Sequence, residues 1–119
     1  MKTKKELRES YDQMKFQMGV FQIRNTVNQK IYIDSSITLT AAWNKNLMQL
    51  QFGSHMNKDL QKEWNEYGED KFQFEIISEL QHDDSKEIDY KKEVKELEKL
   101  FIEELKPFDD RGYNRKVVR

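Results

Sequence analysis

The apolar residues of the chain recur at different spacings, and each change of spacing marks a predicted element. Residues 1–17 carry apolar side chains at helical spacing, which predicts a short amphipathic N-terminal helix. Residues 18–24 and 30–34 are rich in β-branched and aromatic side chains and are separated by a polar turn, which predicts a β-hairpin. Their adjacent apolar positions are typical of strands that are covered on both faces.

Two helices are predicted after the hairpin. Their apolar stripes are formed by Leu39, Trp43, Leu47 and Leu50 in the first helix and by Leu60, Trp64 and Tyr67 in the second. We expect Ser35 or Ser36 to cap the first helix and Asn57 to cap the second. Gly53 and Gly68 are placed where these helices should end.

The last third of the chain adds a strand and a helix. Apolar and polar residues alternate over residues 72–77, which predicts a third strand. A helical pattern then runs from Lys86 to about Leu105, where Pro107 closes it. Three strands form a minimal sheet that helices must cover, so the pattern predicts an α/β domain of the α+β kind.

Composition and charge limit the possible functions. A chain of 119 residues with 12% aromatic and 36% charged residues is typical of one folded domain with a charged surface. The net charge of -1 gives no support to DNA binding by bulk charge. The chain has no cysteine, no secretory signal pattern and no apolar run of membrane-spanning length, so we expect a cytoplasmic protein without membrane contact.

A family resemblance starts in the predicted hairpin. Gly19-Val20-Phe21, followed after ten residues by Tyr32-Ile33-Asp34, resembles the two-part signature of the GIY-YIG nucleases. Further matches follow in the family's order: Trp43, His55, Leu60, Trp64, Tyr67-Gly68, Phe72, Phe74, Glu98, Phe101-Ile102 and Gly112-Tyr113-Asn114. The resemblance covers roughly residues 18–115 and is strongest to small bacterial stand-alone or transcription-regulator-associated members. It implies a three-stranded antiparallel sheet flanked by helices, in one domain over residues 18–119 that follows the helix of residues 1–17.

The resemblance also implies a chemistry. The family cleaves DNA phosphodiester bonds with one divalent cation, so it implies DNA as a partner and Mg²⁺ or Mn²⁺ as the cofactor of an active protein, and otherwise no cofactor. Carried over, Glu98 matches the metal-binding glutamate and Tyr32 the tyrosine that helps to take a proton from the attacking water. His55 matches a frequent histidine, and Asn114 matches the asparagine that holds the site together.

Four positions depart from the family pattern. Phe21 replaces the first tyrosine, Asp34 a glycine, Ala42 the catalytic arginine and Asn46 a histidine. Lys45 lies on the same helical face as Ala42 and could substitute for the arginine, although an ammonium cannot form its planar fork. We expect Lys30 and Lys45 to contact the substrate, and we expect the losses at Phe21 and Ala42 to remove most cleavage activity.

Three functions stay open from the sequence. The first is an impaired endonuclease-like domain with a nucleic-acid-associated or protein-binding role. The second is an active divalent-metal endonuclease that uses Tyr32, Glu98, Lys45 and His55, and the third is a non-enzymatic interaction module. The site residues also have structural alternatives: a solvated helix face for Glu98, a half-buried strand for Tyr32, a helix entry for His55, a tail turn for Asn114, and the core for Phe21. We expect a monomer.

Overall fold

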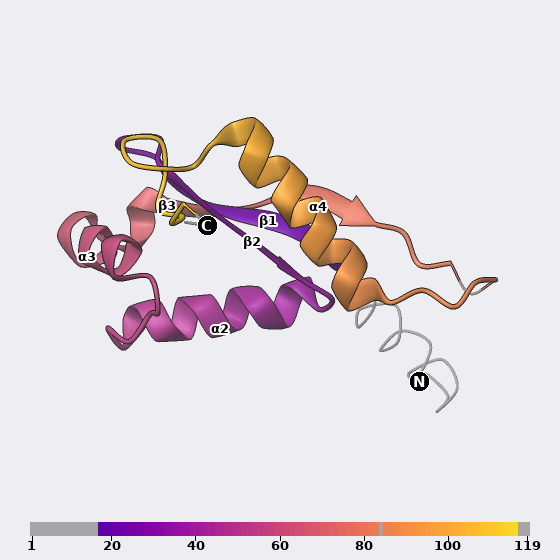
Figure 1. Cartoon of the computed structure of the whole chain (residues 1–119). Helices are drawn as coiled ribbons and strands as arrows, with labels where there is room; N and C mark the ends of the chain where they lie inside the picture. Colours follow the sequence, from indigo (N-terminus) through magenta and orange to yellow (C-terminus); the bar gives the residue numbers. More distant parts are fainter. Residues whose placement is uncertain (1–16, 84, 117–119) are drawn as a thin grey trace, which may run out of the picture.

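A three-stranded antiparallel sheet forms the centre of the molecule. A computed structural model describes residues 17–83 and 85–116. The strands are β1 (Met18–Asn25), β2 (Ile31–Ser36) and β3 (Phe72–Leu80), in the order β2-β1-β3 (Figure 1). The predicted fold class is therefore confirmed, whereas the helix predicted in residues 1–17 lies outside the described residues.

β1 is the central strand and is buried on both faces. Val20, Phe21 and Ile23 are fully buried, as the adjacent apolar positions predict. In the hairpin, Phe21 lies opposite Asp34 and Ile23 lies opposite Tyr32. The two signature segments are therefore neighbours in the sheet, and this register brings Tyr32 beside the core.

Within the described residues, three α-helices and one short 3₁₀ helix pack around the sheet. They are α2 (Leu39–Gln51), α3 (Lys58–Tyr67), η1 (Glu69–Lys71) and α4 (Tyr90–Leu105). In Figure 1, α4 crosses above the sheet, α2 runs below it and α3 lies at one end. The core joins β1, β3, α2, α3 and the C-terminal segment through Phe21, Ile23, Leu39, Leu50, Leu60, Trp64, Phe72 and Tyr113. None of the helices in the described part of the chain has the length and apolar character needed to cross a bilayer.

Two helix starts differ from the predictions. Thr38, and neither of the two serines, precedes α2 at the cap position, and it makes no side-chain cap hydrogen bond. Ser36 Oγ instead accepts from Thr38 N–H at 2.9 Å, a local turn that competes with helix capping. The last helix begins at Tyr90 rather than at residue 86, because the side chain of Asp89 accepts from Lys92 N–H and caps it there. The predicted cap at Asn57 is confirmed, since its side chain accepts from Leu60 N–H at 3.0 Å.

The C-terminal segment docks against the outer edge of β2. Tyr113 N–H donates to the Ile31 carbonyl at 2.9 Å, and Gly112 forms a parallel bridge with Ile31. The Asn114 side chain accepts from Ile33 N–H and donates to the Ile33 carbonyl, both at 2.8 Å. These contacts supply partners to an edge strand whose backbone groups would otherwise face solvent. They also fix the position of β2, the strand that carries Tyr32.

Candidate functional site

A pocket of about 280 Å³ lies between β2, α2 and the loop that follows α2, and we call it the Tyr32 pocket. The side chains that line it belong to Tyr32, Asp34, Ser35, Ser36, Ala41, Ala42, Lys45, Asn46, Gln49, His55 and Met56. It thus brings together Tyr32, Lys45 and His55, three of the predicted site residues. Glu98, Asn114, Phe21 and Lys30 lie outside its lining.

Tyr32 presents a phenol that stays protonated at neutral pH. Burial raises the pKa of its hydroxyl far above the ordinary value, and the negative charges of Asp34 and Glu98 raise it further. Its ring packs edge-on against the His55 ring, with 5.5 Å between the centroids. In this setting Tyr32 can donate a hydrogen bond, for instance to a phosphate oxygen.

His55 is held as a neutral imidazole in one tautomer. Its Nδ1 accepts from Asn57 N–H at 3.0 Å, so the ring proton lies on Nε2 and is donated to Asn46 Oδ1 at 2.6 Å. The side chain is 1% exposed, and burial lowers its pKa. Both ring nitrogens are engaged, an arrangement that favours the role of a structural residue at the entry to α3.

The state of His55 predicts a pH dependence of stability. The folded state keeps His55 neutral, whereas the unfolded chain protonates it near the ordinary pKa of 6.5. The contribution of neutral His55 to the stability of the fold is therefore fully present above pH 6.5. As the pH falls below 6.5 toward the lowered pKa of the folded state, the free energy of unfolding decreases by up to about 1.4 kcal/mol per pH unit. Urea unfolding of the unaltered chain between pH 7 and 5 should show this decline, and His55→Gln should flatten it. The matched variant His82→Gln, at the other histidine, should show the same decline as the unaltered chain. If His55→Gln also shows the full decline, the protonation of His55 does not cause it.

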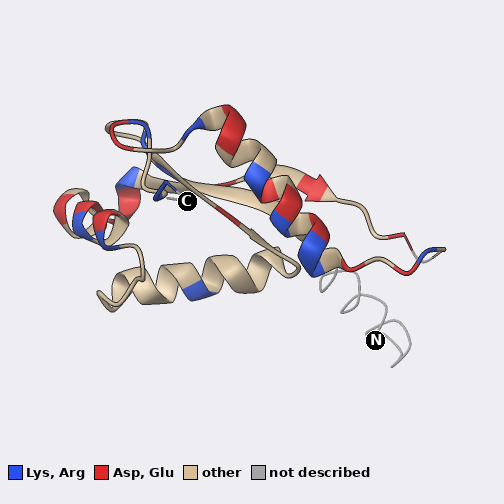
Figure 2. Ribbon diagram, viewed as in Figure 1, with Lys and Arg blue, Asp and Glu red and all other residues tan. Residues whose placement is uncertain are grey.

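The wall formed by α2 carries little charge. Lys45 is the sole charged residue of α2, the helix that carries a single blue segment in Figure 2. It is exposed and lines the pocket. One helical turn before Asn46, Ala42 presents a methyl group to the pocket, and its carbonyl accepts from Asn46 Nδ2 at 2.8 Å. The position that the resemblance gives to an arginine therefore offers no hydrogen-bond donor from its side chain.

Glu98 lies on α4 beside β2 and is already engaged. Its Oε1 accepts from Ser35 Oγ at 2.8 Å and lies 3.4 Å from Lys95 Nζ. Lys95 Nζ also lies 3.7 Å from Asp34 Oδ1. Burial raises the pKa of Glu98, and the neighbouring Asp34 raises it further, while Ser35 and Lys95 act in the opposite direction.

As they are arranged, the carboxylates of this site pair with an ammonium of the chain itself and do not stand free for a divalent cation. Among residues 17–83 and 85–116, no group of three or more His, Cys, Asp or Glu side chains is placed to hold a metal ion. The two carboxylates that do approach each other, Asp34 and Glu98, share the ammonium of Lys95. Sequence analysis missed Lys95 and Ser35; the i,i+3 spacing of Lys95 and Glu98 on α4 was the available signal.

Two further predicted site residues, Phe21 and Asn114, make contacts that support the fold. Phe21 is fully buried, and its ring lies 5.0 Å from that of Phe74, which agrees with the core alternative. Asn114 uses its whole side-chain amide on the backbone of Ile33. Asn114 therefore holds the tail and β2 together next to Tyr32.

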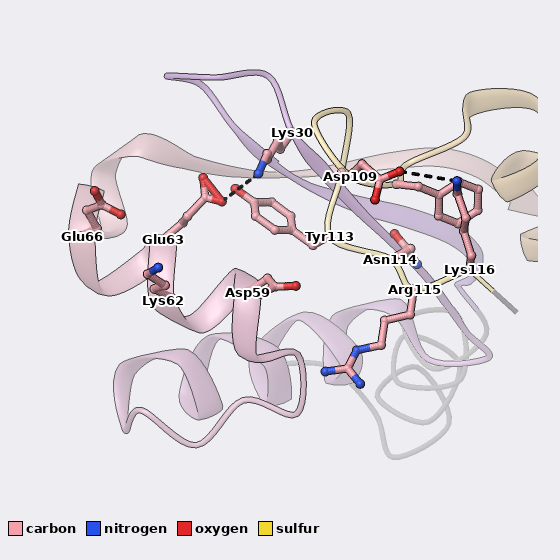
Figure 3. A pocket seen from close by; sticks show the side chains of 12 residues that line it. Lys30, Asp59, Lys62, Glu63, Glu66, Asp109, Tyr113, Asn114, Arg115 and Lys116 are labelled. Carbon is pink, nitrogen blue, oxygen red and sulfur yellow. Dashed lines mark ion pairs between the residues drawn. The ribbon is translucent and has the colours of Figure 1, made fainter. Parts of the chain in front are cut away.

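Lys30 lies in a second, larger pocket of about 510 Å³, apart from Lys45. This pocket lies between α3, the end of the hairpin and the C-terminal segment (Figure 3). Lys30 Nζ is 3.5 Å from Glu63 Oε2 and 5.6 Å from the centre of the Tyr113 ring, and Lys116 pairs with Asp109 at 3.4 Å. Because these lining charges pair with each other, the larger pocket presents no uncompensated charge at these positions. The structure thus does not bring the two predicted substrate-binding lysines together.

Comparison with known proteins relates this arrangement to DNA endonucleases. No family model matches the chain. The chain is 32% identical over 97 residues to Intron-associated endonuclease 1 of Enterobacteria phage T4, a match that covers 81% of this chain and 36% of that protein. The chain therefore spans about a third of the length of this curated relative.

Solved structures show the same relationship at the level of the fold. The catalytic domain of homing endonuclease I-TevI superposes with a TM-score of 0.68 at 29% identity, covering 84% of this chain and 99% of that one. An alanine mutant of the catalytic domain of intron endonuclease I-TevI also gives 0.68, at 28% identity, covering 82% and 92%. The similarity thus extends over nearly the whole of a catalytic domain. Sequence, sheet order and helix arrangement agree, and the chain belongs to the GIY-YIG nuclease superfamily.

Proposed function

We propose that this chain is a GIY-YIG endonuclease-like domain that binds DNA at the Tyr32 pocket and has lost most of its power to cleave it. The observation that carries the proposal is the wall of the pocket at Ala42, where a methyl group stands at the position of the family's arginine. The first signature tyrosine is likewise a phenylalanine, whose ring is buried in the core without a hydroxyl group.

Hydrolysis of a phosphodiester needs positive charge aimed at the phosphorane-like transition state. Removing one preorganised donor from such a site lowers the rate on the order of 10²–10³-fold. Lys45 is the cationic side chain that α2 offers, and its ammonium is a mobile point charge rather than a planar bidentate fork. We therefore expect that Lys45 supports binding of a phosphate but little stabilisation of its transition state.

Binding to DNA is supported by the names of the relatives, which are endonucleases, and by the charge of α2. That helix carries Lys45 and no acidic residue, so a phosphate at the pocket meets no carboxylate from this wall. Tyr32 would add a neutral hydrogen bond from the opposite wall. Asp34 opposes an anion, but Lys95 lies 3.7 Å from it and offsets its charge.

Salt dependence tests the binding directly. Each phosphate neutralised by a protein cation contributes a slope of about -0.9 to log K against log salt. We expect Lys45→Gln to make this slope less negative by about 0.9 for duplex DNA, measured by fluorescence anisotropy in EDTA. Lys99→Gln, at an exposed lysine of α4, is the matched control and should leave the slope unchanged. Equal slopes for Lys45→Gln and the unaltered chain would contradict binding at this pocket.

Cleavage is tested separately on supercoiled and branched DNA with Mg²⁺ or Mn²⁺. We expect little nicking by the unaltered chain, and we expect Glu98→Ala to leave that low rate unchanged. Vigorous nicking that Glu98→Ala abolishes would show an active enzyme and would overturn the proposed loss of cleavage. That outcome would leave the salt-dependence result for Lys45 standing.

A further inference from the structure

Lys95 reaches from α4 to two carboxylates on different elements. Its Nζ lies 3.4 Å from Glu98 Oε1 on the same helix and 3.7 Å from Asp34 Oδ1 on β2. The side chain of Glu98 is 16% exposed and that of Asp34 is 33% exposed, so the two acids are partly withdrawn from water. Lys95 itself is 60% exposed and approaches them from the solvent side.

The arrangement has a simple electrostatic logic. Two carboxylates that meet in a half-buried place repel each other, and a single cation within about 4 Å of both offsets that repulsion. Asp34 is the residue that stands where the family signature has glycine, so this chain has acquired a second acid beside Glu98. A monovalent ammonium from the chain itself is the cation that meets both acids.

We infer that Lys95 is the resident cation of this site and excludes a divalent metal ion from Asp34 and Glu98. Mg²⁺ requires carboxylate oxygens at about 2.0–2.1 Å in near-octahedral geometry, and an ammonium within 4 Å of an oxygen of each acid competes with that shell. Ser35 Oγ holds Glu98 Oε1 at 2.8 Å and thereby keeps that oxygen turned toward β2. Removing the ammonium leaves two adjacent carboxylates that can coordinate a divalent cation.

This inference deepens the proposed function, because a site that keeps its own cation lacks the metal on which hydrolysis depends. Only the effect on catalysis depends on the proposed function; the exclusion of the metal ion does not. The cation test uses no DNA, and the salt-dependence test at Lys45 uses no metal, so the failure of one leaves the other intact.

Titration with Mn²⁺, followed by isothermal calorimetry and by the loss of the free Mn²⁺ electron paramagnetic resonance signal, tests the inference. We expect Lys95→Ala to bind Mn²⁺ about 10-fold or more tightly than the unaltered chain, because a repelling positive charge leaves the site. Lys95→Arg, which keeps a cation, should remain as weak as the unaltered chain. Lys99→Ala, at an exposed lysine one helical turn along α4, is the matched control and should show no gain.

The double variant Lys95→Ala with Asp34→Gly identifies the ligands. It should lose most of the gained affinity, because only one carboxylate remains. Thermal unfolding checks that each variant is folded. The inference is overturned if the unaltered chain binds Mn²⁺ as tightly as Lys95→Ala, if neither binds it, or if Lys95→Arg gains affinity to the same extent.

Discussion

A variant that combines Phe21→Tyr, Asp34→Gly and Ala42→Arg should nick supercoiled DNA at least about 10²-fold faster than the unaltered chain in the presence of Mn²⁺. The guanidinium alone can supply a gain of this size, because a preorganised donor at the developing charge is worth on the order of 10²–10³ in rate. Ala42 lines the Tyr32 pocket, so an arginine at this position can extend into its 280 Å³.

In this assay a DNA phosphate can supply the oxygen ligand that Asp34→Gly removes. Adding Lys95→Ala should therefore raise the rate again, because Asp34→Gly alone leaves Lys95 Nζ 3.4 Å from Glu98. General acid–base assistance by a second tyrosine is worth about 10²–10⁴, although the separate contributions need not multiply. The initial rate of nicking of a supercoiled plasmid measures each step of the series.

The control for this series is the same set of changes with Glu98→Ala, which should return the rate to background. A second control omits Phe21→Tyr, because a hydroxyl added to a fully buried ring needs a hydrogen-bond partner and can destabilise the fold. If every folded member of the series nicks no faster than the unaltered chain, the loss of activity does not reside at these positions.

Gly112→Ala should destabilise the chain by about 3 kcal/mol, the upper end of the usual cost of overpacking. A Cβ at this position would lie 2.4 Å from the Pro107 carbonyl oxygen and 2.5 Å from the Ile31 carbonyl oxygen. Both atoms belong to the backbone, so neither can rotate away, and the C-terminal segment must lift from β2. Urea unfolding should show this loss together with a gain in proteolysis after residue 106.

Gly53→Ala is the matched control for Gly112→Ala. A Cβ at Gly53 would meet no atom within 4 Å, and its cost comes from the left-handed backbone, with φ at 75°. We expect about 1 kcal/mol for this variant. If Gly112→Ala costs no more than Gly53→Ala, close packing of the tail on β2 is not what restricts residue 112 to glycine.

Local patterns predicted the elements because the forces that form them are local. The stripe of Leu39, Trp43, Leu47 and Leu50 became the face of α2 that packs on the core. Asn57 caps α3 as expected, because an amide one position before a helix reaches N–H groups within a few residues. Ser35 is the counterexample: its hydroxyl meets Glu98, 63 residues away, instead of a helix end.

The site was less predictable because it depends on contacts between distant segments. The sequence grouped Tyr32, Lys45 and His55 in one candidate site, and the structure places all three around one pocket. It could not show that His55 is held through Asn46. The contact between Asp34 and Lys95 likewise requires the packing of α4 against β2, which no spacing along the chain encodes.

The docking of the C-terminal segment on β2 sets the order in which the protein can fold. Asn114 meets Ile33 across 81 residues, so the edge of the hairpin that carries Tyr32 is completed by a segment that is synthesised long after it. Contacts of such long sequence separation form late, because the loop-closure entropy is lost before they are gained. A nascent chain therefore exposes an open strand edge until residues 112–114 have been synthesised, and the strand that carries Tyr32 is completed late in folding.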